Sequence, residues 1–131
     1  MRRQLSRPLV AWLLVAAWMG VIFLFSAQPQ RDVAPGPLVD YLSKKTAHLL
    51  SYAALASLAY RATRLTWPTW SRGGAALVAL ALAIAYAVMD EFHQSFSPGR
   101  NPSPADVGID TLGALLGLAL ALLARSRPSR L

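Results

Sequence analysis

The sequence contains no cysteine, and it has only six acidic residues and two histidines. The absence of cysteine excludes disulfide bonds and thiol chemistry. Charged residues make up 15% of the chain, well below the roughly 25% of an average soluble domain. The few acids and histidines therefore stand out against an apolar background, and their positions carry most of the information.

Apolar residues make up 55% of the 131 residues, a length that suits one domain, 1–131. The apolar segments predict four transmembrane helices, at about 9–27, 42–62, 74–93 and 107–124. The first segment has no charge for 19 residues, close to the roughly 20 that cross a hydrocarbon core. A signal peptide is the alternative for this segment. We disfavour it because the apolar run is long and Phe25 is bulky where a cleavage site needs a small residue.

Positive charge is distributed unevenly between the two sides of such a bundle. The amino terminus, the turn at 61–74 and the carboxyl tail share one side, which holds nine arginines and no acid: Arg2, Arg3, Arg7, Arg61, Arg64, Arg72, Arg125, Arg127 and Arg130. Positive residues mark the cytoplasmic side. The sequence therefore predicts an all-α fold, a four-helix transmembrane bundle with both termini cytoplasmic. This topology accounts for the net charge of +7, so we expect no nucleic acid partner.

The other polar residues, including all six acids and both histidines, gather at the opposite, outer end. An i, i+4 spacing places them in stripes on three helices. These stripes are Lys44, His48 and Tyr52 on the second helix, Tyr86, Asp90 and Gln94 on the third, and Asp106 and Asp110 on the fourth. Gly113 and Gly117 continue the last stripe and allow close helix packing, so we expect Asp110 to point into the bundle.

The stripes predict one cluster of side chains at the outer end. Our candidate substrate-binding residues are Lys44, Lys45, His48, Tyr52, Asp90, Glu91, Gln94, Arg100, Asp106 and Asp110. Lysine and arginine suit a phosphate or carboxylate ligand, and we expect the Pro98-Gly99-Arg100 turn to aim Arg100 back over the cluster. The alternative is a self-neutralising ion-pair network that closes the bundle and does no chemistry, because the cluster's three cations face four acids.

Catalysis and metal binding are two further possibilities for this cluster. A histidine with nearby carboxylates can form a general acid–base site, so the candidate catalytic residues are His48, Asp90 and Glu91. Carboxylates together with His48 or His93 could also bind a divalent metal ion. Glu91-Phe92-His93 does not have the H-E-x-x-H spacing, however, and we find no other metal motif. We therefore predict no metal and no cofactor.

Taken in order, these motifs resemble the VanZ-like family of small bacterial membrane proteins. The resemblance rests on Lys44 or Lys45 with His48 and Tyr52, Asp90-Glu91-x-x-Gln94, Pro98-Gly99-Arg100, Ser103-x-x-Asp106 and Gly113. Each motif is weak alone, whereas the ordered set is fairly specific and extends over nearly the whole chain. The chain departs from the pattern at Asp110, where the family often has an amide.

The resemblance implies a multi-pass protein of the bacterial cytoplasmic (inner) membrane. The family is named after an accessory protein linked to resistance to the glycopeptide teicoplanin, which acts on peptidoglycan precursors outside the membrane. We therefore hypothesise a cell-envelope protein whose outer site recognises an anionic lipid or a lipid-linked cell-wall precursor. A membrane hydrolase or transferase acting on a lipid-linked phosphate, and a purely structural or partner-binding bundle, are the alternatives. Membrane lipids are expected partners, and the Gly113/Gly117 face suits either a homo-oligomer or packing within the bundle.

Overall fold

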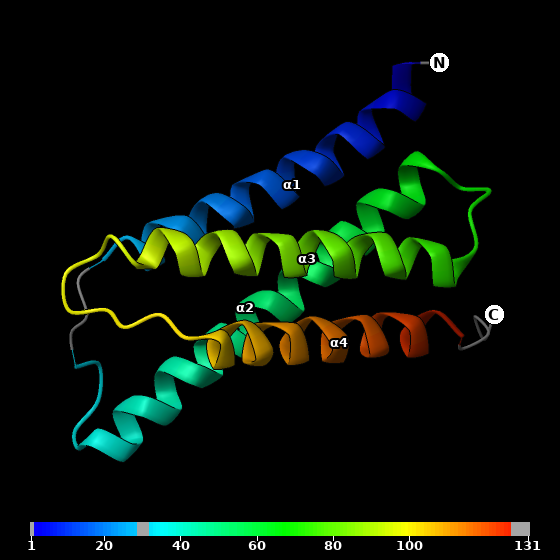
Figure 1. Cartoon of the computed structure of the whole chain (residues 1–131). Coiled ribbons are helices and arrows are strands. Elements are labelled where there is room, and N and C mark those ends of the chain that lie inside the picture. The colour runs from blue at the N-terminus through cyan, green and yellow to red at the C-terminus, as the bar shows by residue number, and fades with distance from the viewer. Residues whose placement is uncertain (1, 29–31, 127–131) are drawn as a thin grey trace.

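The computed structural model describes residues 2–28 and 32–126, and over these residues the chain forms four helices and no strand (Figure 1). The helices are α1 (Arg2–Ser26), α2 (Pro37–Thr66), α3 (Arg72–Gln94) and α4 (Pro104–Ser126). The predicted all-α four-helix bundle is confirmed. Each helix begins a few residues before the apolar segment that predicted it.

Three of these helices contain a segment long and apolar enough to cross a membrane, namely Ser6–Ser26, Arg72–Gln94 and Pro104–Ala124. The exception is α2, which carries charged residues near both of its ends. It has 30 residues, about 45 Å at 1.5 Å per residue, and it contacts each of the other three helices. These neighbours bury its central residues, including Tyr52, Leu55 and Tyr60, so α2 needs less apolar sequence than a helix that faces lipid all round.

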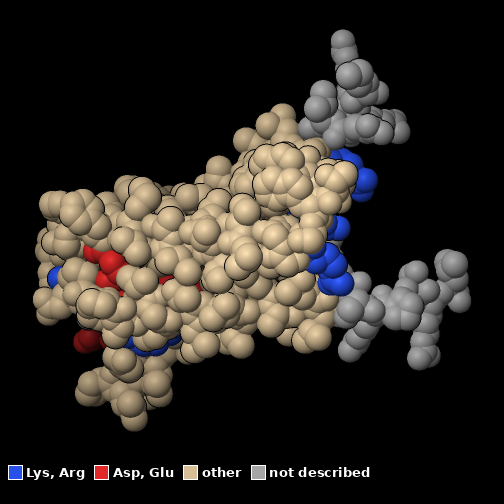
Figure 2. Space-filling view, turned by 45° about the vertical axis from the view of Figure 1, so that its right-hand side comes forward, with Lys and Arg blue, Asp and Glu red and all other residues tan. Residues whose placement is uncertain are grey.

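The direction of the helices alternates along the chain, so α1 and α3 run one way and α2 and α4 run the other (Figure 1). The start of α1 and the end of α4 consequently lie at one end of the bundle, together with the α2–α3 turn. All the acids lie at the opposite end (Figure 2). Arg127 and Arg130, which entered the charge count, lie outside the described residues.

The closest helix contact joins α2 and α4 at two glycines. A Cβ atom added at Gly113 would lie 2.2 Å from the carbonyl oxygen of Leu49, and one at Gly117 would lie 2.3 Å from that of Ala53. Any side chain there would force the helices apart. The glycine face is therefore used for packing within the bundle, and α2 covers the surface that a second copy of the chain would need.

Aromatic side chains attach α1 to its neighbours through hydrogen bonds to polar atoms on α2 and to the α1 backbone. Trp18 Nε1 donates to the carbonyl oxygen of Ser51 at 2.9 Å, and Tyr86 Oη on α3 donates to that of Met19 at 2.5 Å. Trp12 Nε1 donates to Thr66 Oγ1 at 2.8 Å. These bonds satisfy polar groups that lipid could not, and they hold α1 against α2 and α3 along the bundle.

Candidate functional site

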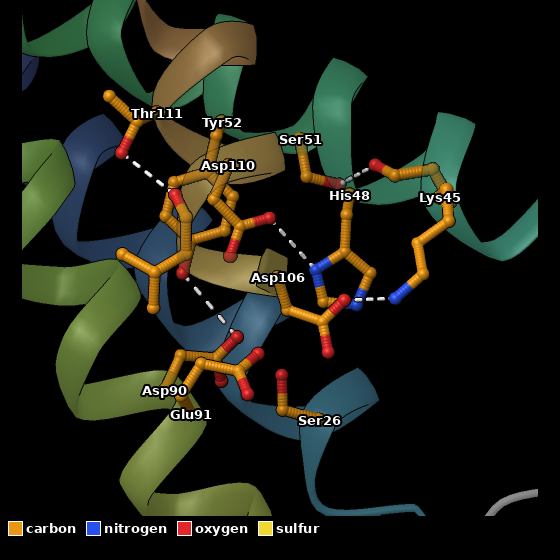
Figure 3. Close-up of polar contacts among 12 residues, drawn as sticks. Ser26, Lys45, His48, Ser51, Tyr52, Asp90, Glu91, Asp106, Asp110 and Thr111 are labelled. Carbon is orange, nitrogen blue, oxygen red and sulfur yellow. Dashed lines mark hydrogen bonds and ion pairs between the residues drawn. The ribbon is translucent and has the colours of Figure 1, made fainter. Parts of the chain in front are cut away.

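His48 and Asp110 form the central contact of the polar end (Figure 3). Nδ1 of His48 on α2 lies 3.0 Å from Oδ1 of Asp110 on α4. Asp110 is 0% exposed and points into the bundle, as the stripe of Asp106 and Asp110 predicts. When the carboxylate accepts this bond, the proton of the neutral ring is on Nδ1, and Nε2 keeps its lone pair.

Asp90 on α3 is held by neutral hydrogen-bond donors. Tyr52 Oη donates to Oδ2 of Asp90 at 3.4 Å, and Gln94 Nε2 donates to the same oxygen at 3.2 Å. The Gln94 amide also lies 3.4 Å from Ser26 Oγ at the end of α1. All four helices therefore contribute to this end, because Tyr52 joins α2 to Asp90 on α3, Gln94 joins α3 to Ser26 on α1, and His48 joins α2 to Asp110 on α4.

Glu91 is the third buried carboxylate of this end. Its Oε2 accepts a hydrogen bond from the backbone N–H of Ser103 at 3.1 Å. Its Oε1 is buried and has no hydrogen-bond partner among the described residues, and the same holds for Oδ2 of Asp110. Two carboxylate oxygens inside the bundle thus have free lone pairs, an arrangement that is costly unless a ligand or ion uses them.

The two lysines of the cluster each form an ion pair with an acid. Lys45 forms an ion pair with Asp106 across α2 and α4, whereas Lys44 pairs at 2.6 Å with Asp40, one turn earlier on its own helix. Asp40 also accepts the backbone N–H of Val33 at 2.5 Å. The hydrogen bond from the Lys44 ammonium, and then that from Val33, lower the pKa of Asp40.

Arg100 has no carboxylate partner among the described residues. Its Nε donates to the carbonyl oxygen of Gln28 at 3.1 Å, and Nη2 donates to that of Phe25 at 3.3 Å. These carbonyls are at the carboxyl end of α1, where they lack helical partners and a positive charge is favourable. The turn at 98–100 therefore brings Arg100 to the end of α1, and its charge is not neutralised by an acid.

A cavity of about 980 Å³ opens at this end between α1 and α2. Its polar wall includes seven of the candidate residues: Lys44, Lys45, His48, Tyr52, Gln94, Arg100 and Asp106. The opposite wall is apolar and comes from Trp18, Val21, Ile22 and Phe25 on α1. Asp90, Glu91 and Asp110 are not part of the cavity wall and lie deeper in the bundle.

The self-neutralising ion-pair network that the sequence allows forms for the two lysines but does not extend to all the acids. The two lysines near the cavity each pair with an acid, but no Lys or Arg of the described residues forms an ion pair with Asp90, Glu91 or Asp110. His93 also lies apart from these acids, since its ring stacks on Phe23 of α1 with centroids 4.2 Å apart.

Asp40 and Ser26 contribute to the site but were not among the predicted site residues, and Ser103 was named only within the Ser103-x-x-Asp106 motif. The i, i+4 spacing of Asp40 and Lys44 is a usable signal for their ion pair. Ser26 carries no comparable signal, because its role depends on where α1 ends relative to α3. Ser103 acts through its backbone N–H, which any residue except proline could supply.

The order of the motifs along the chain agrees with a known protein family. A family model described as VanZ/LLP1 matches residues 11–125 of the chain. No curated protein and no solved structure matches it. The match includes the last three helices and most of α1, and with them every residue of the candidate site. The chain is a membrane protein of the VanZ/LLP1 family.

Proposed function

We propose that this protein binds the negatively charged headgroup of a membrane lipid or a lipid-linked cell-wall precursor in the cavity between α1 and α2. The observation that supports this most is the composition of the cavity wall, which combines Lys44, Lys45 and Arg100 with an apolar face of α1. An amphiphile with a phosphate headgroup has both features. Its headgroup would contact Arg100 and the two lysines, while its chain would lie along Val21, Ile22 and Phe25.

Arg100 is the residue of this wall best suited to an anion. The two lysines are already paired with Asp40 and Asp106, so an anion must compete for them. The guanidinium of Arg100 contacts only backbone carbonyls, and its remaining N–H groups can form charge-assisted bonds to a phosphate.

The distribution of arginines and acids supports a position of the cavity on the outer side of the membrane. Arginines without acids lie at the end opposite to the cavity, which supports cytoplasmic termini and a cavity at the outer leaflet. Because α1 and α3 run in the same direction (Figure 1), the chain between them must return across the membrane through α2. The site would then face the side on which cell-wall precursors are used.

Lipid binding by an Arg100 variant tests the proposal. We expect purified wild-type protein to retain a polyprenyl phosphate in native mass spectrometry and to bind the neutral polyprenol weakly. Arg100→Gln should weaken phosphate binding by about tenfold, because a hydrogen bond to a charged group contributes about 1.5–3 kcal/mol.

The matched control is Arg72→Gln at the opposite end, because Arg72 also donates to a backbone carbonyl, that of Leu122 at 2.5 Å. This variant should bind like wild type. Equal binding by wild type and Arg100→Gln would remove Arg100 from the site, and equal binding of the phosphate and the alcohol would contradict an anion site altogether.

The His48–Asp110 contact favours a second candidate function, a membrane hydrolase or transferase acting on a lipid-linked phosphate. A buried carboxylate that accepts from Nδ1 leaves Nε2 of His48, which reaches the cavity wall, available as a general base. This differs from the sequence-based hypothesis, which gave His48 the partner Asp90 or Glu91. Turnover of a lipid phosphate that disappears in a folded His48→Ala variant would support this function over simple binding.

Glycopeptide resistance is a proposal for this chain, taken from the association of its family with teicoplanin. We expect cells carrying the wild-type protein to tolerate more teicoplanin than cells with an empty vector or with Asp90→Asn at matched membrane levels. Equal protection by both proteins would make Asp90 dispensable for the trait.

A further inference from the structure

Three carboxylates that lie deeper in the bundle than the cavity wall are buried and form no ion pair with a lysine or arginine of the described residues. Asp90 is 3% exposed, Glu91 is 7% exposed and Asp110 is 0% exposed. Their partners among the described residues are a tyrosine, an amide, a backbone N–H and His48. Buried charges in proteins are paired or coordinate metals, because an isolated buried carboxylate is very costly.

The positions of these groups suit a shared cation. One donor atom from each of His48, Asp90 and Asp110 lies within 4.8 Å of the others. Ligands of one ion are each about 2.1 Å from it and so lie about 3–4 Å apart. Small side-chain rotations would therefore bring the three donors to coordination distance. The three residues come from α2, α3 and α4, so the backbone of the bundle already holds them together.

Free lone pairs are present in the same place. Oδ2 of Asp110 and Oε1 of Glu91 are buried and have no hydrogen-bond partner in the part of the chain that the structure describes. Figure 3 shows the carboxylate of Asp110 directed toward the His48 ring, and those of Asp90 and Glu91 next to each other at the end of α3. His48 and Tyr52 also belong to the cavity wall, which gives an ion a route to these oxygens.

We propose that His48, Asp90 and Asp110 bind a divalent metal ion of the Mn²⁺ or Zn²⁺ class. Imidazole favours transition metals and carboxylates suit harder ions such as Mn²⁺, so a mixed set of donors selects ions that accept both. The double positive charge compensates the buried acids. His48 then serves as a metal ligand, which excludes it as a free base.

The proposed metal site does not depend on lipid recognition, because metal binding can be measured without any lipid ligand. The expectation of no metal rested on the absence of a ligand motif in the sequence. Ligands that come one from each of three helices leave no such motif.

Metal binding by the purified full-length protein is the decisive measurement. After EDTA treatment in detergent micelles, equilibrium dialysis against Mn²⁺ or Zn²⁺ should give about one bound ion per chain for wild type. Asp110→Asn keeps the size of the side chain and removes its charge, and it should bind at least tenfold more weakly. Asp32→Asn removes an exposed acid at the same end and should bind like wild type.

A spectroscopic readout separates coordination from loss of folding. Pulsed electron paramagnetic resonance of bound Mn²⁺ should show coupling to an imidazole nitrogen, and this coupling should be lost in His48→Gln. Asp90→Asn is a second ligand variant, and circular dichroism and gel filtration verify that each variant is folded. No wild-type binding, binding unchanged in folded Asp110→Asn and Asp90→Asn, or bound Mn²⁺ without nitrogen coupling would each overturn the site.

Discussion

Asp40 connects the segment before α2 to the first turns of that helix. Its carboxylate accepts the backbone N–H groups of Val33 at 2.5 Å and Ala34 at 3.3 Å, and it pairs with Lys44 at 2.6 Å. One side chain thus positions the loop beside the cavity and sets the direction of Lys44. The spacing of Asp40 and Lys44 is visible in the sequence, whereas the bonds to Val33 and Ala34 depend on the loop geometry.

The lowered pKa of Asp40 makes this arrangement dependent on pH. Its contribution to stability is fully present above the unfolded pKa, about 3.9, and is lost as the pH falls through the lower folded pKa. The Val33 amide chemical shift, followed by nuclear magnetic resonance in micelles, should therefore titrate with a midpoint below about 3.9. Asp40→Asn should abolish this titration. A midpoint at or above the ordinary aspartate value would contradict the assigned hydrogen bonds.

At the scale of elements, the fold depends on how closely α2 approaches α4. Gly113 and Gly117 bring the two backbones into contact at Leu49 and Ala53. This contact sets the distance across which His48 meets Asp110 and Lys45 meets Asp106. A packing feature near the middle of α4 therefore determines the geometry of the polar end.

Gly113→Ala should separate these helices, because the added Cβ would lie 2.2 Å from a backbone oxygen that cannot move independently. We expect a loss of at least about 2 kcal/mol in the free energy of unfolding, typical of severe overpacking. Unfolding of the purified protein by detergent titration measures this loss.

The control on the same helix is Gly108→Ala, because a Cβ atom there meets nothing within 4 Å. We expect it to be neutral or to stabilise the helix by up to about 1 kcal/mol, since alanine favours the helical backbone. Equal unfolding free energies for the two variants would show that the α2–α4 contact is looser than described.

At the scale of the whole molecule, the separation of charge defines two chemically different ends. Arg7, Arg61, Arg64 and Arg72 lie where α1 begins and where α2 turns into α3, and all the acids lie at the other end of the helices (Figure 1). Figure 2 shows blue side chains at one end of the visible face and red ones at the other. The positive-inside rule then predicts the side of the membrane that each end faces. Asn101 and Thr69 are exposed residues at the two ends, which makes them suitable probes.

Single cysteines test this orientation cleanly, because the chain has none of its own. In intact cells, a membrane-impermeant maleimide should label Asn101→Cys and should label Thr69→Cys only after the membrane is permeabilised. The opposite pattern would place the cavity in the cytoplasm and would remove the proposed access to outer-leaflet precursors.

The sequence by itself determined the helical class, the approximate positions of the four helices, the family and the gathering of polar residues at one end. Each follows from local properties, namely the length of apolar runs, helical periodicity and the order of short motifs. The partners of the polar side chains depend on helix rotation and crossing. Only the tertiary structure therefore paired His48 with Asp110, because close packing of α2 against α4 sets that distance. It also placed Arg100 against the end of α1 and left Asp90, Glu91 and Asp110 without a lysine or arginine partner among the described residues.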